Sequence, residues 1–281
     1  MPDAQPIGRN RSRKPLSSQD HPYQEQHVTT RPAPLQLAHL IVDAQRDGRE
    51  LEQLAPELMP KDFADAYQTQ QEILRLLDAT VAGWKIGSKS PTGHTQGSPL
   101  PSECLFASST HFDRADFGKM GFELEIAFRF GRDFLPRAQP YSPDEVLNGI
   151  ESMASTVEIV TSHFAKWPNI EPLLQLSDML NHGALIVGEF VPFNPEFDFL
   201  KPALKLTFDG QDITPTTIGN PAGDPRRLLP WLVNHHTTQG STLPAGLVIT
   251  TGTYTGVYNP PRAGRLVGQI EGLPTVALTV S

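Results

Sequence analysis

The sequence is almost without cysteine: Cys104 is the single one among 281 residues. The chain can therefore form no internal disulfide and no zinc site built on several cysteines, and a reducing cytoplasm suits it best. It also lacks any run of 18 or more apolar residues that would span a membrane, and its first residues lack the apolar core of a signal peptide. Neither a P-loop nor a GxGxxG motif occurs, so nothing supports nucleotide binding.

Basic residues are scarcer than acidic ones. The 23 lysines and arginines face 31 acidic residues, and the net charge of −8 argues against broad nucleic-acid binding. Residues 1–34 contain six of the 27 prolines, five basic and three acidic residues, and almost nothing apolar, which predicts a disordered tail. Its basic residues could bind an anion, although a solvated tail is the more common outcome. The remaining chain carries a charge of −10.

The remaining 247 residues suffice for one large domain with a helical appendage. Apolar residues recur at helical spacing from Leu35 to Ala44 and from Phe63 to Leu77, so residues 35–80 are predicted to form an N-terminal helical segment. Residues 81–281 are expected to form the second, larger domain. Strands dominate there and helices are interspersed, which indicates an α+β fold with a mixed, curved sheet.

Several segments of this second region carry clear local signals. Ser142 to Glu145 forms a capping box that predicts a helix ending near Glu151, and Asp209-Gly210 predicts a hairpin. Further helices are expected over Pro172 to Leu180 and after Asp224-Pro225. Strands are expected over residues 183–188, 203–208, 247–251, 266–270 and 275–280.

The segment from Gly121 to Asp133, GFELEIAFRFGRD, alternates between apolar and polar residues and predicts a strand. Glu123 and Glu125 then lie on the same face, roughly 7 Å apart. Two like charges this close repel unless a cation lies between them. An exposed polar face is the alternative interpretation of this pair taken alone.

A second strand, Ser155 to Val160, favours the metal interpretation, because Glu158 is a single carboxylate in an apolar stretch and requires a partner. Three carboxylates, water and a chelating substrate would complete the oxygen shell that Mg²⁺ or Mn²⁺ prefers. We therefore expect Glu123, Glu125 and Glu158 to bind one divalent metal ion.

Lysine and histidine residues supply further candidates. Lys85 belongs to the short predicted strand Gly83 to Gly87 and lies just where this strand gives way to a polar, glycine-rich loop; a lysine extending from a strand edge is the alternative. His94 and His182 could take part in catalysis, but a loop histidine is more often solvated. His235-His236 lies late in a helix and is expected to complement the charge of its C-terminus.

Five segments in order, GWKIG, FELEIAF with GRD, VEIV, DMLNHGALIVG and TTGTYTG, together resemble the fumarylacetoacetate hydrolase superfamily. The similarity covers about residues 35–281. It points to the branch of 2-keto-4-pentenoate hydratase and 4-oxalocrotonate decarboxylase. The resemblance implies the β-roll core of the family's C-terminal domain, a Mg²⁺ or Mn²⁺ enzyme of aromatic compound catabolism, and a homo-oligomer.

The resemblance also implies individual residues. It assigns Lys85 to the active site as a proton shuttle and, near the position of an active-site Asp in relatives, where the alignment is loose, Glu103 as a second catalytic candidate. Gly252 and Thr253 would bind the distal part of the substrate. Near a cation and partly desolvated, the ammonium group of Lys85 would be disfavoured, so that it could exchange protons near neutral pH.

Three segments depart from the family pattern. Gly87-Ser88-Lys89-Ser90 replaces a GLTS segment and adds a charge at the mouth of the site. Glu158 to His163 replaces EIVDSR and loses an Asp and an Arg, and Asp178 to Gly183 replaces a DNAS-type segment. The resemblance thus implies a small-molecule 2-oxo acid substrate, with hydration ahead of decarboxylation. A non-catalytic subunit that partners such an enzyme, and a tailoring enzyme on a larger keto acid, remain alternatives.

Overall fold

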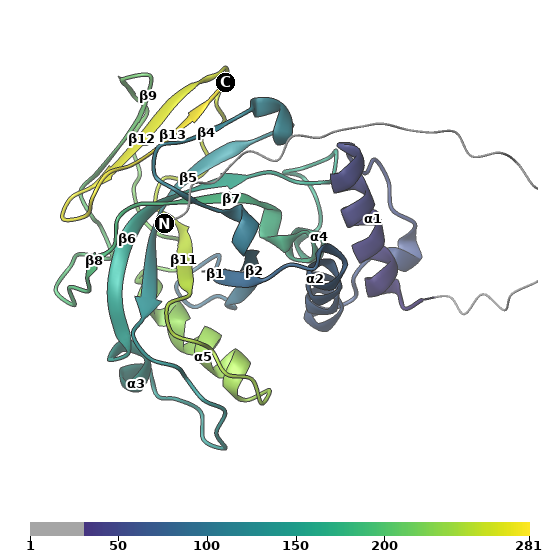
Figure 1. The fold of residues 1–281 in the computed structure, drawn as a ribbon, viewed down its shortest axis with the longest axis horizontal. Coiled ribbons are helices and arrows are strands. Elements are labelled where there is room, and N and C mark those ends of the chain that lie inside the picture. The colour runs from purple at the N-terminus through teal and green to yellow at the C-terminus, as the bar shows by residue number, and fades with distance from the viewer. Residues whose placement is uncertain (1–30) are drawn as a thin grey trace, which may run out of the picture. The chain divides into compact units, whose positions relative to one another are not determined.

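The computed structural model describes residues 31–281, which form a strongly curved sheet, a smaller second sheet and several helices (Figure 1). The helices are α1 (Ala33–Asp47), η1 (Pro56–Leu58), α2 (Phe63–Leu77), η2 (Ser102–Cys104), η3 (Arg114–Asp116), α3 (Pro143–Leu147), α4 (Pro172–Ser177), η4 (Met179–Asn181), η5 (Pro225–Leu228) and α5 (Leu229–Thr237). The strands are β1 (Val81–Gly87), β2 (Gln96–Pro101), β3 (Leu105–Ala107), β4 (Thr110–Phe112), β5 (Gly121–Phe130), β6 (Ile150–Val160), β7 (His182–Val187), β8 (Val191–Pro192), β9 (Leu204–Phe208), β10 (Gln211–Asp212), β11 (Val248–Thr253), β12 (Gly264–Ile270) and β13 (Val276–Val280).

The larger sheet has the order β2-β1-β11-β5-β6-β7-β3, and β8 pairs with the start of β6. β1 with β11 and β3 with β7 are parallel pairs, whereas the other neighbours are antiparallel. β5 and β6 are its longest strands, and they bend together through the sheet (Figure 1). The predicted α+β fold with a mixed, curved sheet is confirmed.

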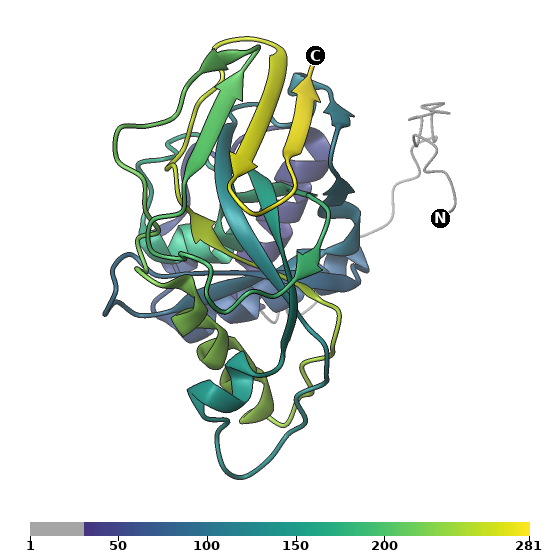
Figure 2. The same ribbon diagram turned by 90° about the vertical axis from the view of Figure 1, so that its left-hand side faces the viewer.

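The alternation in β5 separates a buried apolar face from a polar one. Phe122, Leu124 and Ile126 are fully buried in the main core, which also contains Leu266 and Val276 of the second sheet. That sheet has the order β10-β9-β12-β13-β4, and Figure 2 views it from the front, with β9 in green and β12 and β13 in yellow. Because the second sheet covers the apolar face, the glutamates of β5 point to the other side.

Truncating this apolar face should destabilise the whole fold. We expect Leu124→Ala to lower the free energy of unfolding by about 2–5 kcal/mol, because a fully buried leucine leaves a cavity behind. Urea denaturation measures the change, with Leu135→Ala as the control, since Leu135 is 58% exposed. Equal, small effects of the two variants would contradict the packing of the second sheet against β5.

The N-terminal helices pack beside the larger sheet, where α2 contacts α4 and the edge strand β2. α1 and α2 contact one another, and Leu37, Ile41 and Ile73 share a buried apolar cluster with Phe164 and Leu174. The side chain of Asp62 caps α2 by accepting a hydrogen bond from the Asp65 amide. Both helices predicted from the apolar spacing are thereby confirmed, and they lie beside the sheet, next to α4, in Figure 1.

The structure differs from the sequence prediction at three elements. The helix expected over Pro172 to Leu180 ends at Ser177, because Met179 to Asn181 form a separate turn with positive φ values. The Ser142 capping box is present, but its helix ends at Leu147 instead of near Glu151, because Glu151 already belongs to β6. Part of the expected glycine-rich loop is strand β2, which pairs with β1. β2 contains Pro99 and ends at Pro101; proline donates no backbone hydrogen bond and is tolerated here because β2 lies at the sheet edge.

Residues 32–281 form one compact unit. The prediction of a disordered tail over residues 1–34 concerns mainly residues 1–30, which lie outside the described residues, while Ala33 and Pro34 already belong to α1. None of the helices described in residues 31–281 is both long and apolar enough to cross a membrane.

Candidate metal centre and substrate cavity

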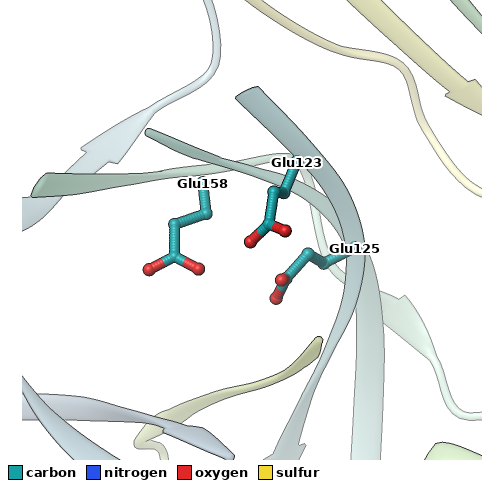
Figure 3. A group of neighbouring side chains, drawn as sticks. All are labelled: Glu123, Glu125 and Glu158. Atoms are coloured by element: carbon teal, nitrogen blue, oxygen red, sulfur yellow. The ribbon is translucent and has the colours of Figure 1, made fainter. Parts of the chain in front are cut away.

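The antiparallel register of β5 and β6 creates a cluster of carboxylates. Glu123 lies directly opposite Glu158, and Glu125 lies opposite Thr156. One carboxylate oxygen from each of the three glutamates lies within 4.8 Å of the others. Figure 3 shows the three carboxylate groups pointing into the same space from the two strands. The structure therefore brings together the three residues that the sequence analysis selected as metal ligands.

Burial makes this cluster costly without a cation. Glu125 is 1% exposed and Glu158 is fully buried, and each has one buried oxygen, Oε1 of Glu125 and Oε2 of Glu158, that no hydrogen bond satisfies. Buried polar atoms are normally paired, so two unpaired carboxylate oxygens in one cluster require a positive partner. Three hard oxygen donors are the ligands that Mg²⁺ and Mn²⁺ prefer, and the residues present therefore fit such an ion.

Glu125 is held in place by the neighbouring strand β11. Its Oε2 accepts hydrogen bonds from the hydroxyl group of Thr250 and from the amide of Gly252, the latter at 3.2 Å. The pairing of β11 with β5 shifts register between Thr250 and Thr253. Gly252 has a φ of 86° in this irregularity, a conformation that favours glycine, and this backbone turns its N–H toward the carboxylate.

Glu158 is paired with two basic side chains through a single oxygen. The ammonium nitrogen of Lys85 lies 2.7 Å from Oε1, and Nδ1 of His182 lies 2.6 Å from the same atom. Both partners are buried, with side-chain exposures of 12% for Lys85 and 2% for His182. Oε2 of Glu158 stays free to bind a ligand.

A left-handed turn delivers part of this arrangement. Met179, Leu180 and Asn181 have φ values of 52°, 54° and 59°, which non-glycine residues rarely adopt. The turn directs the carbonyl oxygen of Leu180 to the ammonium group of Lys85 at 2.9 Å. It also leads directly into His182, the first residue of β7.

Burial and charge shift the acidities of this cluster in opposite directions. Burial, together with the charge of Glu158, raises the pKa of Glu123 to about 7 against the opposing effect of Lys85. Burial also raises the pKa of Glu125, and the charges of Glu158 and Glu123 add to this effect. Burial alone would raise the pKa of Glu158, but Lys85 and His182 hold it below its ordinary value. The ionised form is thus favoured most at Glu158.

The lowering of the Lys85 pKa was expected beside a bound cation and stays a prediction, whereas the protein groups alone shift this pKa the other way. Burial disfavours its ammonium form, yet the charges of Glu158, Glu123 and Glu125 outweigh burial and raise the pKa above its ordinary value. The sequence analysis considered a cation beside Lys85, whereas the nearest charged groups are carboxylates. Lys85 is therefore an ammonium ion in this arrangement.

The histidines differ most from expectation. His182 is not a solvated loop residue but a buried partner of Glu158. A signal was present in the sequence, because His182 directly precedes a buried strand, but its register against β6 was not readable. Burial lowers the pKa of both His235 and His236, the latter to about 4, so they do not complement the helix end with charge.

The carboxylate cluster opens into a cavity of about 190 Å³. Gly252 and Thr253, the expected substrate-binding residues, line it. Asn220 was not predicted; its amide donates to the carbonyl oxygens of Thr251 and Gly252 at 2.9 Å each and fixes that end of β11. The complete lining is Lys85, Ile86, Gly87, Ser88, Lys89, Gln96, Glu123, Glu125, Leu180, Asn220, Pro221, Thr251, Gly252 and Thr253.

The structure does not bring Glu103 into this group. Glu103 lies in η2, is exposed, and accepts a hydrogen bond from the neighbouring Ser102 at 3.3 Å. It is absent from the cavity lining. A cavity of about 400 Å³ beside Leu51 and Phe164 is larger, but it contains no comparable cluster of carboxylates.

Comparisons with known proteins agree with this geometry. The family model described as fumarylacetoacetate (FAA) hydrolase C-terminal matches residues 88–281. A 2-keto-4-pentenoate hydratase of Burkholderia vietnamiensis is 25% identical over 253 residues, which cover 86% of this chain and 95% of the relative. A 2-hydroxyhexa-2,4-dienoate hydratase of Comamonas testosteroni is 24% identical over 250 residues, covering 85% and 94%.

Among solved structures, the 4-oxalocrotonate decarboxylase of Pseudomonas putida G7, complexed with magnesium and adipate, has the same fold. Its TM-score is 0.78 at 20% sequence identity, and the match covers 91% of this chain and 100% of the other. A second structure of that decarboxylase, complexed with calcium and acetate, matches with a TM-score of 0.77.

Proposed function

Because the chain belongs to the fumarylacetoacetate hydrolase family, we propose that it is a metal-dependent lyase that hydrates an unsaturated 2-oxo or 2-hydroxy carboxylate. The observation that carries this proposal is the buried cluster of Glu123, Glu125 and Glu158, with unpaired oxygens beside the Lys85 ammonium group. The hydratases at about 25% identity support the same class of reaction.

The three glutamates would hold Mg²⁺ or Mn²⁺. When bound, the cation would supply a Lewis acid for a substrate that chelates through its 2-oxygen and one carboxylate oxygen. The neighbouring residues hold the ligand set rigid: Thr250 and Gly252 orient Glu125, while Lys85 and His182 orient Glu158.

Lys85 would move the protons of the reaction. With 2-hydroxypenta-2,4-dienoate as substrate, its ammonium group donates a proton to the terminal carbon, and the 2-hydroxyl proton returns to the Lys85 amine as the 2-oxo enone forms. Water then adds to carbon 4, two carbons from the carbonyl, and a proton goes to carbon 3, giving 4-hydroxy-2-oxopentanoate. One added water balances the equation. Gly252 and Thr253 would hold the distal end of the chain by hydrogen bonds.

The experiment that tests this function incubates the purified chain and Mg²⁺ with 2-hydroxypenta-2,4-dienoate. We expect the conjugated absorbance to disappear without release of CO₂ and to persist when EDTA removes the metal. An equal rate with EDTA would rule out metal dependence, and persistent absorbance with Mg²⁺ and with Mn²⁺ would rule out hydration of this substrate.

Lys89 favours a second candidate, decarboxylation of a 2-oxo dicarboxylate. Lys89 lines the same cavity, is exposed, and makes no hydrogen bond or ion pair within residues 31–281. An unpaired ammonium group at the mouth of an acidic cavity would attract the second carboxylate of such a substrate. The carbon–carbon bond to that carboxylate breaks, CO₂ leaves, and its electron pair passes into a dienolate. Protonation of the 2-oxygen of this dienolate gives the same dienol that a hydratase uses.

We expect Lys89→Met to lower kcat/KM for the dicarboxylate 4-oxalocrotonate by about fivefold, since an exposed charge pair is worth up to about 1 kcal/mol. The value for the monocarboxylate 2-hydroxypenta-2,4-dienoate should stay within about twofold. Steady-state kinetics with both substrates, followed by absorbance and by CO₂ release, provide the measurement. A uniform loss on both substrates would contradict a role in recognising the second carboxylate.

The non-catalytic subunit remains a distinct alternative. It predicts that the chain binds metal but turns over neither substrate unless a hydratase or decarboxylase partner is added. The homo-oligomer implied by the family resemblance also stays a prediction, which sedimentation of the purified chain measures directly.

A further inference from the structure

A buried aspartate joins two segments of the chain near the ends of α4 and β6. Asp178 is 2% exposed and follows α4. Its Oδ2 accepts hydrogen bonds from the hydroxyl of Ser162 at 2.7 Å and from the amide of His163 at 3.0 Å. Its Oδ1 lies 2.6 Å from Nδ1 of the His163 ring. Both partners come directly after β6, the strand that carries Glu158.

Asp178 is also the residue immediately before the left-handed turn over Met179 to Asn181. Three consecutive non-glycine residues with positive φ are strained, and such a conformation persists only where surrounding contacts enforce it. The hydrogen bonds to the carboxylate of Asp178 hold the start of this turn. The contacts that follow it are the Leu180 carbonyl on Lys85 and the His182 ring on Glu158.

We propose that His163 is a positioning residue, whose charged imidazole ring holds Asp178 and thereby fixes the turn that places Leu180 on Lys85 and His182 on Glu158. His163 touches neither the cavity nor the carboxylate cluster. Its effect reaches the site through one short stretch of backbone, residues 178–182. The proposal rests on the proposed function only for the identity of the ligand that Glu158 binds.

The surroundings of His163 leave Asp178 as its dominant charge. Three other charged residues, Arg49, Glu50 and Asp116, share a small cavity of about 150 Å³ with it. Arg49 lies 3.3 Å from Asp47 and Glu50 lies 3.4 Å from Lys119, so both are paired elsewhere, and Asp116 is exposed.

Protonation therefore makes the contact dependent on pH. Burial lowers the pKa of His163, but the charge and hydrogen bond of Asp178 outweigh it and raise the pKa above the ordinary value of 6.5. Because the folded-state pKa is raised, the stabilisation is complete below pH 6.5 and is lost as pH rises through the folded-state pKa. The contact between His163 and Asp178 should therefore weaken as the pH rises above the folded-state pKa of His163.

Two variants of the full chain separate charge from packing. His163→Gln keeps a hydrogen-bond donor but has no charge, whereas His163→Arg is charged at every pH used. Mn²⁺ affinity is measured by isothermal titration between pH 6 and 9, and the melting temperature is recorded at each pH. Protons compete with Mn²⁺ for the three glutamates in the same way in the parent and in both variants. The ratio of variant to parent affinity therefore isolates the effect of His163.

At pH 6 we expect His163→Gln to bind Mn²⁺ about tenfold more weakly than the parent, the scale of losing a residue that orients a metal ligand. His163→Arg should match the parent at pH 6 and exceed it progressively towards pH 9. A ratio that does not change with pH, or a glutamine variant as tight as the parent, would overturn the proposal.

If the parent protein binds no Mn²⁺, the proposed function is refuted, but the positioning role of His163 can still be tested. In that case the melting temperature decides: the parent should approach the glutamine variant as pH rises, while the arginine variant should not. Parallel melting curves for all three proteins would overturn the positioning role.

Discussion

Turnover of 2-hydroxypenta-2,4-dienoate is expected to fall by about a hundredfold or more in Lys85→Met, the usual scale of a lost general acid–base group. The Lys85 side chain is 12% exposed and its ammonium group lies 2.7 Å from Glu158, so it is placed to transfer protons inside the cavity. The metal ion and the chelate that it forms with the substrate would supply most of the affinity for the bound substrate. The loss should therefore appear in kcat, with KM little changed.

The control for this variant is Lys205→Met, at an exposed lysine of β9 whose ammonium group lies 3.8 Å from Asp212. It should retain parental turnover. Isothermal titration should show that Lys85→Met still binds Mn²⁺, about tenfold more weakly than the parent, because the three glutamates remain but Glu158 loses one of its two orienting partners. Parental turnover in Lys85→Met would remove Lys85 from the mechanism.

Loss of one carboxylate of the cluster should have the second large effect. We expect Glu125→Gln to weaken Mn²⁺ binding by on the order of a hundredfold or more, since even a residue that merely orients a ligand is worth about ten- to a hundredfold. Glutamine retains a carbonyl oxygen that can accept the bonds from Thr250 and Gly252, so the surrounding fold should persist. Isothermal titration measures the affinity.

Glu151→Gln provides the matched control, because Glu151 lies on β6 but is exposed and outside the cluster. Its Mn²⁺ affinity should equal that of the parent. Equal affinities of the parent and Glu125→Gln would show that the ion binds without Glu125 and would remove it from the ligand set.

The sequence predicted the carboxylate cluster because a strand has a simple period. Alternation in β5 placed Glu123 and Glu125 on one face, and the apolar surroundings of Glu158 indicated that it required a partner. The helices α1 and α2 were readable for the same reason, since their apolar residues repeat at helical spacing. These features depend only on neighbours along the chain.

Features that depend on distant segments were not predictable. The place of His182 depends on the register of β7 against β6 and on a left-handed turn built from Met, Leu and Asn, which no sequence rule for turns selects. The direction of the Lys85 pKa depends on three carboxylates from other strands. Glu103 followed from a loose alignment alone, and its short 3-10 helix leaves it exposed.

The most direct test of the metal centre is a crystal of the full chain grown with Mn²⁺ and measured at the manganese absorption edge. The account predicts one strong anomalous peak among the carboxylate groups of Glu123, Glu125 and Glu158, within about 2.0–2.3 Å of an oxygen of each, as hard divalent cations require. A peak elsewhere, or no peak at a Mn²⁺ concentration that saturates binding in solution, would contradict it.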